Sequence, residues 1–329
     1  MNAEALLTVE NLSVSFETEA GRVRAVDRLS FEVRHGEVLG LVGESGCGKS
    51  VTALSVMRLL PKPSGRIDSG RMMFGGTDLA ALPPDAMRSI RGRRIAMIFQ
   101  EPMTALNPVH TIGRQLGEVY GLHHPEMGRP AVTAASLAML KEVGIPDPGQ
   151  RMGQYPHQIS GGMRQRIMIA MALACGPDLL IADEPTTALD VTIQAQILEL
   201  ITTMQQQNDM SVMLITHDLG VIAETCQRVC VMYAGTLVES ANVAALFDRP
   251  AHPYTQGLLN SIVRLGNRRK TKLPTIAGMV PSLAELPPGC RFQNRCPKVM
   301  DICRNVAPSL VSVGPEHMAS CHAVEMELP

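Results

Sequence analysis

A glycine-rich stretch near the N-terminus constrains this chain more than any other feature: Gly43-Glu44-Ser45-Gly46-Cys47-Gly48-Lys49-Ser50. The apolar run 38–42 precedes it and predicts a buried strand, and the apolar-periodic run 51–60 follows it and predicts a helix. A strand, a glycine loop and a helix in this order are the context that a phosphate-binding loop requires. The lysine and serine that close the stretch disfavour the alternative, which is a chance glycine turn before a helix.

The residue types in this loop suit a nucleotide phosphate. Glycines allow a tight turn, so that backbone N–H groups converge on phosphate oxygens at the positive end of the helix dipole. Lys49 is placed to reach the β- and γ-phosphates, and the Ser50 hydroxyl is placed to ligate Mg²⁺. We interpret Cys47 as a filler whose backbone N–H matters more than its thiol.

Length and composition narrow the class of protein. A chain of 329 residues fits one large domain and a smaller one. A net charge of −1 and the absence of Trp disfavour a nucleic-acid-binding surface. No apolar run is long enough to span a bilayer, and residues 1–10 lack the regions of a signal peptide. We therefore expect a cytosolic protein whose membrane role depends on partners, and eight cysteines that form no disulfides.

The patterning along the chain predicts an α/β fold with a doubly wound core. Alternating residues predict a partly exposed antiparallel sheet, and uninterrupted apolar runs predict buried parallel strands. Residues 61–70 are rich in turn formers, and a helical insertion covers about 101–165. We place a first domain at 1–250 and a small C-terminal extension at 251–329. The predicted strands are 7–16, 26–33, 38–42, 71–75, 95–99, 179–182, 212–215 and the hairpin 229–233 with 237–239; the main helices are 112–155 with breaks, 164–174 and 187–207.

Four polar side chains lie just past the ends of predicted strands: Lys49, Gln100, Asp183 and His217. Ligands of open α/β sheets bind at the carboxyl ends of strands, so this shared placement predicts one site. Asp183 is placed to hold Mg²⁺, and Glu184 to take a proton from an attacking water. Helix capping or a surface ion pair is the alternative for this acidic pair, and a structural role is the alternative for His217.

A second glycine motif, Ser160-Gly161-Gly162, precedes a strong helix. Taken alone it predicts a serine-capped helix start. Two glycines at a helix N-terminus also form an anion site. Because the chain already has one phosphate loop, we interpret this second site as serving a nucleotide on another subunit.

Together these motifs closely resemble those of ATP-binding-cassette (ABC) ATPases, in particular the D-type ATP-binding subunits of dipeptide, oligopeptide and nickel permeases. The resemblance covers nearly the whole chain and implies a P-loop NTPase fold with an antiparallel β subdomain and a helical subdomain. It identifies Ser160 to Met163 as the family signature, with Met163 where Gln is usual, and Asp190 as the D-loop. It also implies an adenine-stacking role for Phe16, for which core packing is the alternative. The implied ATP-binding residues are Phe16, Gly43, Glu44, Ser45, Gly46, Cys47, Gly48, Lys49, Ser50, Val51 and Gln100; those implied to hold Mg²⁺ are Ser50, Gln100 and Asp183; those implied in catalysis are Glu184 and His217.

The resemblance also implies partners and a cargo. It implies an ATP-hydrolysing subunit at the cytoplasmic face of the membrane that powers uptake of di- and oligopeptides. Its expected partners are a second ATPase subunit of the related F type, two transmembrane permease subunits and a periplasmic or extracellular substrate-binding protein, with no nucleic acid. Alternatives are the same machine importing nickel, glutathione or another small solute, a non-transport ABC ATPase, and a module that binds ATP without cleaving it.

The C-terminal extension carries Cys290, Cys296, Cys303 and Cys321, which are half of the cysteines in the chain. Zinc sites usually contain closer C-x₂-C pairs, which this segment lacks. Four thiolates can hold a [4Fe–4S] cluster, and the spacing resembles that of a subset of dipeptide permease ATPases. We rank the cluster first, four reduced structural cysteines second and zinc third.

Overall fold

The computed structural model describes residues 4–19, 21–100, 105–187, 190–262 and 275–326. The chain divides into two compact units. The first consists mainly of residues 81–214, with 34–37, and the second of 5–33, 38–80 and 215–329. The chain therefore leaves the second unit after residue 80 and returns to it after residue 214. The sequence-based boundary at residue 250 remains a prediction.

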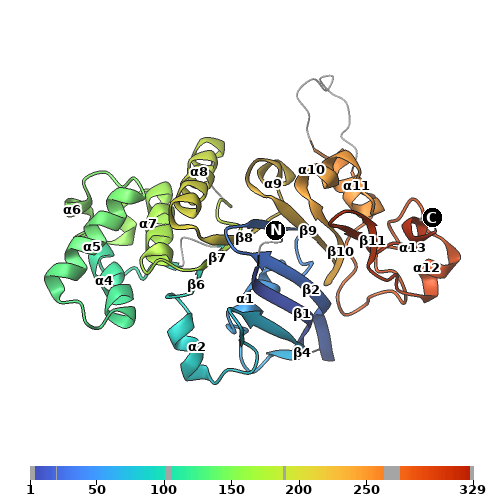
Figure 1. Ribbon diagram of the computed structural model, residues 1–329, viewed down its shortest axis with the longest axis horizontal. Helices are drawn as coiled ribbons and strands as arrows, with labels where there is room; N and C mark the ends of the chain where they lie inside the picture. Colours follow the sequence, from blue (N-terminus) through green and yellow to red (C-terminus); the bar gives the residue numbers. More distant parts are fainter. Residues whose placement is uncertain (1–3, 20, 101–104, 188–189, 263–274, 327–329) are drawn as a thin grey trace. The chain divides into compact units, whose positions relative to one another are not determined.

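An antiparallel sheet forms one layer of the second unit, in the strand order β2-β1-β4-β5 (Figure 1). Its strands are β1 (Ala5–Thr18), β2 (Gly21–Arg34), β4 (Gly65–Phe74) and β5 (Thr77–Asp78). The first two were predicted from alternation. The prediction of a turn-rich segment over 61–70 is wrong from Gly65 onward, because this part of β4 pairs with β1 between Phe16 and Ser13. Asp68 of β4 further stabilises the pairing of β4 with β1, since its carboxylate accepts a hydrogen bond from the Ser15 hydroxyl at 3.0 Å.

A second set of strands in this unit has the order β11-β12-β10-β9-β3. Strand β3 (Val38–Val42) is buried throughout and pairs in parallel with β9 (Arg228–Tyr233). The hairpin partner β10 (Thr236–Asn242) continues the sheet to β12 (His317–Ala319) and β11 (Val311–Gly314). The C-terminal extension therefore adds strands to the same sheet as β3, which the sequence did not predict. The helices of the unit are α1 (Lys49–Val56), α9 (Leu219–Thr225), α10 (Val243–Asp248), α11 (Pro253–Asn260), α12 (Asp301–Asn305) and α13 (His322–Glu325).

A buried aromatic cluster joins the extension to this sheet. Tyr254 of α11 and Phe292 pack edge-on against Tyr233 of β9, with ring centroids 4.7 and 5.1 Å from the Tyr233 centroid. Glu239 of β10 is fully buried and accepts hydrogen bonds from the backbone N–H groups of Ala251 and His252, at 2.7 and 2.9 Å. Apolar packing and a buried polar centre thus both anchor the extension.

The first unit contains parallel strands and a helical region. Strands β6 (Ile95–Ile98) and β7 (Leu179–Asp183) pair in parallel, and β8 (Ser211–Thr216) follows β7 in the sheet order. Helices α4, α5 and α6 pack together beside α7 in the green part of Figure 1. The predicted insertion is thus helical, although residues 101–104 of it lie outside the described part of the chain. The helices are α2 (Pro84–Ile90), α4 (Ile112–His123), α5 (Arg129–Glu142), α6 (Pro148–Arg151), the 3₁₀ turn Pro156–Gln158, α7 (Gly161–Leu173) and α8 (Val191–Asn208).

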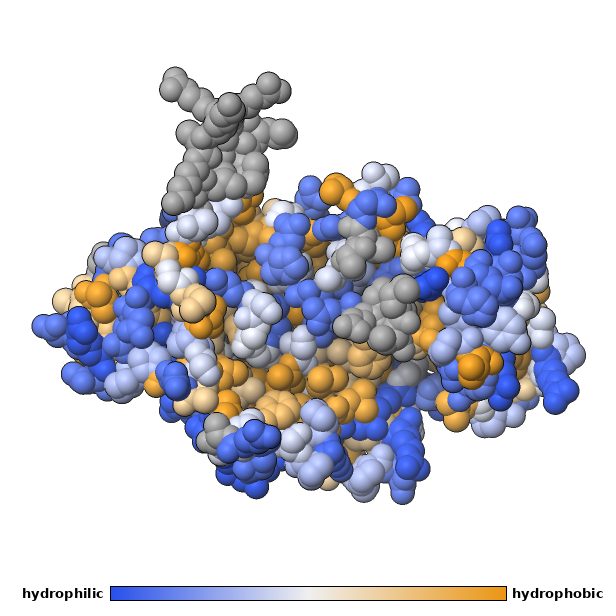
Figure 2. Space-filling view, turned by 180° about the vertical axis from the view of Figure 1, so that it is seen from behind, coloured by the Kyte–Doolittle hydropathy of each residue, from blue (hydrophilic) through white to orange (hydrophobic). Residues whose placement is uncertain are grey.

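The molecular surface is mixed in character. Figure 2 shows hydrophobic residues scattered among hydrophilic ones on one face. Within the described residues, no helix combines the length and the hydropathy that a membrane crossing needs.

Candidate functional site

The predicted site residues fall into two sets, one in each compact unit. The second unit holds the glycine loop 43–50, Phe16 and His217. The first unit holds Gln100, the segment 160–163, Asp183, Glu184 and Asp190.

The glycine loop has the backbone that its sequence predicts. It connects β3 to α1, and Gly48 has a left-handed conformation (φ +100°) immediately before the helix. A Cβ atom at Gly48 would lie 2.7 Å from the Ala25 carbonyl oxygen, and one at Gly43 would lie 2.2 Å from that of Met232. Both positions therefore require glycine: Gly48 for its left-handed conformation and Gly43 for its close packing against the backbone.

Lys49 is the charged group of this loop and is 5 % exposed. Its ammonium group donates hydrogen bonds to the carbonyl oxygens of Gly43 and Glu44, at 2.6 and 3.1 Å. A phosphate can replace such neutral acceptors with a stronger, charged one. Ser45 and Gly46 are exposed, so the backbone of the loop is open to a ligand.

Cys47 fits the interpretation of a filler. Its side chain is 1 % exposed, and burial raises the pKa of its thiol, an effect that the Lys49 charge opposes. A thiol with a raised pKa is a poor nucleophile at neutral pH.

The other two residues of this set lie at strand ends. His217 is exposed and directly follows β8, and the next residue, Asp218, caps α9 by accepting a hydrogen bond from Gly220 N–H at 2.7 Å. Phe16 is half-buried near the end of β1, opposite Gly65 of β4. A Cβ atom at Gly65 would lie 2.8 Å from the Phe16 ring, so the ring rests against a glycine and packs closely.

In the first unit, the structure brings Gln100 and Glu184 together. Asp183 ends β7 and is 3 % exposed, and Glu184 begins the following turn in a left-handed conformation (φ +46°). The Glu184 carboxylate accepts hydrogen bonds from the Gln100 amide at 3.1 Å and from the Thr187 hydroxyl at 2.9 Å. The sequence did not identify Thr187 as a partner of this carboxylate, although its place three residues later in the same turn was a usable signal.

The segment 160–163 forms a capped helix start. The Ser160 hydroxyl accepts a hydrogen bond from Met163 N–H at 3.3 Å, and a Cβ atom at Gly161 would meet nothing within 4 Å. The amide of buried Gln165, one turn further along α7, donates to the Pro185 carbonyl oxygen just after Glu184. The exposed helix start is therefore connected to the turn that holds the acidic pair, a link that sequence reasoning missed.

Asp190 immediately precedes α8 in the same unit. Its carboxylate accepts a hydrogen bond from Ile193 N–H at 3.0 Å, as an N-cap residue does. The two residues before it, 188 and 189, lie outside the described part of the chain.

Comparison with known proteins identifies the family. The family model described as ABC transporter matches residues 26–187, and the one described as oligopeptide/dipeptide transporter, C-terminal region, matches residues 238–303. The probable peptide ABC transporter ATP-binding protein of Sinorhizobium fredii is 54 % identical over 97 % of this chain and 95 % of its own length. The chain belongs to the ABC transporter family. The dipeptide transport ATP-binding proteins of Bacillus subtilis and Escherichia coli are 54 % and 47 % identical, each over 97 % of this ABC transporter chain and over 94 % and 96 % of their own lengths.

Solved structures support the same fold. A dimeric bacterial ABC transporter cassette aligns with a TM-score of 0.65 at 24 % identity, covering 72 % of this chain and 98 % of the cassette. The cbiO1 protein of Clostridium perfringens, part of the ABC transporter complex cbiONQ, aligns with a TM-score of 0.63 at 24 % identity, covering 75 % of this chain and 92 % of its own. The predicted fold class, a P-loop NTPase of the ABC ATPase type, is confirmed.

The four cysteines of the extension lie near one another in this ABC transporter chain. All eight cysteines are free thiols. Burial raises the pKa of Cys290 to about 11, and the charges of Cys303, Cys296 and Cys321 raise it further. Among the described residues, however, no three or more His, Cys, Asp or Glu side chains are arranged to hold a single metal ion.

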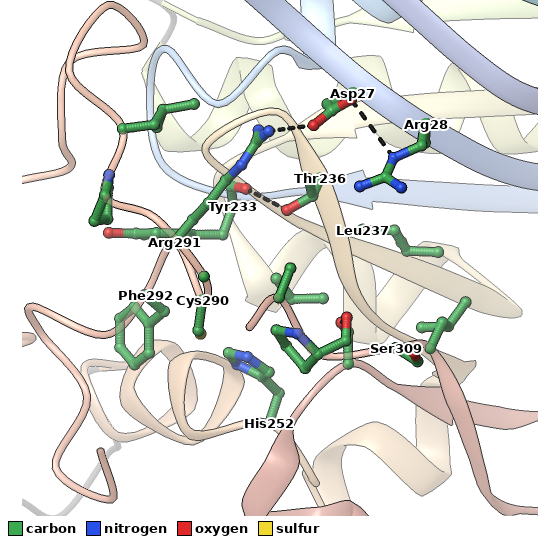
Figure 3. A pocket seen from close by; sticks show the side chains of 18 of the residues that line it. Asp27, Arg28, Tyr233, Thr236, Leu237, His252, Cys290, Arg291, Phe292 and Ser309 are labelled. Carbon is green, nitrogen blue, oxygen red and sulfur yellow. Dashed lines mark hydrogen bonds and ion pairs between the residues drawn. The ribbon is translucent and has the colours of Figure 1, made fainter. Parts of the chain in front are cut away.

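A cavity of about 550 Å³ lies beside Cys290 in the second unit. Figure 3 shows Arg291 reaching from the extension to the Asp27 carboxylate of β2, with which it forms an ion pair. His252 also lines the cavity and is 2 % exposed. The extension is thus joined to the antiparallel sheet as well as to β9 and β10.

Proposed function

We propose that this chain is the ATP-hydrolysing subunit of an ABC importer that takes up di- and oligopeptides. The observation that carries the proposal is the combination of a complete nucleotide-binding motif set with a C-terminal region matched by the oligopeptide/dipeptide transporter family model. The relatives named peptide or dipeptide transport proteins support this cargo. Nickel, glutathione or another small solute is the alternative cargo, and a non-transport ABC ATPase ranks below both.

In this proposal the glycine loop binds ATP. The backbone from Gly43 to Val51 surrounds the phosphates, Lys49 leaves its carbonyl acceptors for the β- and γ-phosphates, and Phe16 stacks on adenine. Ser50, Gln100 and Asp183 would hold Mg²⁺. The buried position of Asp183 fits this role, because a buried carboxylate needs a cation or hydrogen bonds. When bound, Mg²⁺ supplies charge neutralisation at the phosphates.

Hydrolysis then depends on Glu184, on His217 and on a contact with the second ATPase subunit. Glu184 accepts a proton from the attacking water, and its hydrogen bonds to Gln100 and Thr187 orient the carboxylate. His217 orients the γ-phosphate and the water. The signature Ser160 to Met163, with Asp190 as the D-loop, serves the nucleotide bound to the second ATPase subunit, and the exposed Gly161 backbone supports an anion contact there.

The chain is a peripheral protein at the cytoplasmic face of the membrane, where it acts with partners. They are a related F-type ATPase subunit, two transmembrane permease subunits and a periplasmic or extracellular substrate-binding protein. We place the permease contact on the helical region of the first unit. Exposed apolar side chains there support a protein contact: Val109, Leu122 and Tyr155 are 73 %, 70 % and 38 % exposed.

We also propose that Cys290, Cys296, Cys303 and Cys321 hold a [4Fe–4S] cluster. The backbone N–H of Cys290 donates a hydrogen bond to the Cys303 carbonyl oxygen at 2.8 Å, and this contact between two of the four cysteines supports a shared site. Each thiolate of such a cluster binds a different iron, so its ligands are more widely spaced than those of one metal ion. The absence of close C-x₂-C pairs disfavours zinc, while four reduced structural cysteines remain the alternative.

Anaerobic purification tests the cluster. The wild-type chain is expected to contain iron and acid-labile sulfide, with a broad visible absorbance that is lost in Cys296→Ser. Cys175→Ser, which changes a partly buried cysteine of the first unit, serves as the matched control and is expected to keep the absorbance. A colourless wild-type chain without iron would contradict the cluster.

Reconstitution in lipid vesicles tests the function. We expect ATP hydrolysis by the assembled transporter to rise when dipeptides and their binding protein are added, and to be lost in Lys49→Ala. A response to nickel or glutathione but not to peptides would select the alternative cargo.

A further inference from the structure

The C-terminal extension makes direct contact with the glycine loop. Arg295 forms a bidentate ion pair with Glu44, the second residue of the loop, with Nη1–Oε2 and Nη2–Oε1 distances of 2.6 and 3.0 Å. The Arg295 side chain is 4 % exposed and that of Glu44 is 31 % exposed. The two residues are 251 positions apart in the sequence but belong to one compact unit.

A second contact fixes the backbone of the same residue. The Glu44 N–H group donates a hydrogen bond to the Tyr254 hydroxyl oxygen at 2.9 Å. Tyr254 is fully buried in the aromatic cluster with Tyr233 and Phe292, so its hydroxyl is held rigidly. Burial raises the pKa of this hydroxyl, which therefore stays protonated and uncharged. The extension thus holds both the side chain and the backbone of Glu44.

Arg295 is itself positioned by the extension. Its Nε donates to the Ala277 carbonyl oxygen at 3.1 Å, and its guanidinium carbon lies 5.8 Å from the centroid of the Tyr233 ring. The hydrogen bonds to Glu44 raise the pKa of Arg295 above its usual value, so that it is charged throughout the pH range of the folded protein. A guanidinium held in this way is preorganised to pair with a carboxylate.

The charge of Glu44 makes this contact relevant to nucleotide binding. A triphosphate brings several negative charges to a loop that already carries a carboxylate. Like charges in one loop repel each other, so an unpaired Glu44 carboxylate would oppose the binding of ATP. The positive charge of Arg295 neutralises the Glu44 carboxylate and so removes its repulsion of the phosphates.

We propose that Arg295 and Tyr254 are positioning residues for ATP: Arg295 neutralises Glu44, and Tyr254 fixes the backbone at the start of the phosphate loop. This inference rests on the proposed function, in which the loop binds ATP. It gives the C-terminal extension a role in nucleotide affinity that is separate from its cysteines.

Charge variants of the pair test the proposal. In the full chain, Arg295→Gln is expected to weaken Mg·ATP binding about fivefold to tenfold. In the assembled transporter it is expected to raise KM for ATP by the same factor and to leave kcat within about twofold. Arg295→Lys keeps the charge and should recover most of the affinity. The double variant Glu44→Gln with Arg295→Gln removes both charges and should return the affinity to near the wild-type value. Tyr254→Phe should weaken binding about threefold, since it removes the hydrogen-bond acceptor of the Glu44 N–H group.

The controls separate this role from a structural one. Arg304→Gln changes an exposed arginine of the same extension and should alter neither KM nor affinity. A wild-type chain that binds no Mg·ATP would contradict the proposed function. A wild-type chain that binds, together with an Arg295→Gln variant of equal affinity, would overturn the inference alone. Failure of Glu44→Gln to restore affinity in the double variant would overturn the charge argument.

Discussion

At the scale of single residues, Glu184 carries the chemistry of the proposed site. Its left-handed backbone directs the chain away from β7, and one carboxylate oxygen accepts hydrogen bonds from both Gln100 and Thr187. Left-handed conformations are uncommon for residues other than glycine, and they persist where the surroundings hold them. These two hydrogen bonds fix the orientation of the carboxylate.

Glu184→Gln is expected to stop hydrolysis while keeping ATP bound. The glutamine oxygen can still accept a hydrogen bond, but the amide cannot take a proton from water. We expect hydrolysis to fall by roughly 10²–10⁴-fold and ATP to remain with the protein through gel filtration. Glu199→Gln, on the exposed face of α8, is the matched control and should keep the wild-type rate. Undiminished phosphate release by Glu184→Gln would remove Glu184 from its role.

At the scale of elements, His252 is the N-cap residue of α11, and its burial makes the stability of the fold depend on pH. Its Nδ1 accepts a hydrogen bond from Tyr254 N–H at 3.0 Å, and burial lowers the pKa of His252 from 6.5 to about 4, an effect that the Glu239 charge opposes. Because the folded pKa is the lower one, the unfolded chain binds a proton between pH 6.5 and 4 that the folded chain does not. This contribution to stability is therefore present above pH 6.5 and is lost as the pH falls to 4.

The expected loss is at most about 1.4 kcal/mol per pH unit across this range. His252→Asn keeps an oxygen that can accept from Tyr254 N–H but does not titrate. Urea unfolding at pH 7, 6 and 5 should therefore show a smaller loss of stability for the variant than for the wild type. Equal losses of stability in the two proteins would contradict the inference that His252 is buried and neutral.

Glu239 anchors the extension to β10. Its carboxylate accepts hydrogen bonds from Ala251 N–H, His252 N–H and, at 2.7 Å, His317 Nε2 of β12. Glu239→Ala leaves these donors buried without an acceptor and is expected to lower the free energy of unfolding by about 3–5 kcal/mol. Glu239→Gln keeps one oxygen acceptor and should cost less. A change below about 1 kcal/mol in Glu239→Ala would show that the extension does not depend on this centre.

The elements that could be predicted from the sequence are those whose structure depends on neighbouring residues. The glycine loop, β3 and α1 follow from adjacent residues, and the buried run 179–182 marks β7. The strand β4 was predicted too short, because its first residues are polar and gain their partners only from β1. Strands β11 and β12 were missed, since both are short and β12 pairs with β10, which lies some 80 positions earlier, while β11 joins the sheet only through β12. The Arg295–Glu44 pair depends on the folded extension, and no spacing in the sequence indicates it.

At the scale of the whole molecule, the phosphate loop and the C-terminal extension belong to one compact unit. The extension contacts the loop through Arg295 and Tyr254, joins β2 through Arg291, and adds strands to the sheet that contains β3. Because the extension contacts the loop, its disruption is expected to lower the affinity of this ABC transporter chain for ATP, in addition to any effect on the four cysteines.

The most direct test of the account is Mg²⁺-dependent ATP hydrolysis by the assembled transporter in lipid vesicles, with Lys49→Ala and Glu184→Gln measured beside the wild type. We predict hydrolysis that requires Mg²⁺, that Lys49→Ala abolishes together with ATP binding, and that Glu184→Gln abolishes while ATP stays bound. A wild-type transporter that transports its cargo without hydrolysing ATP, or hydrolysis that survives both substitutions, would contradict the account.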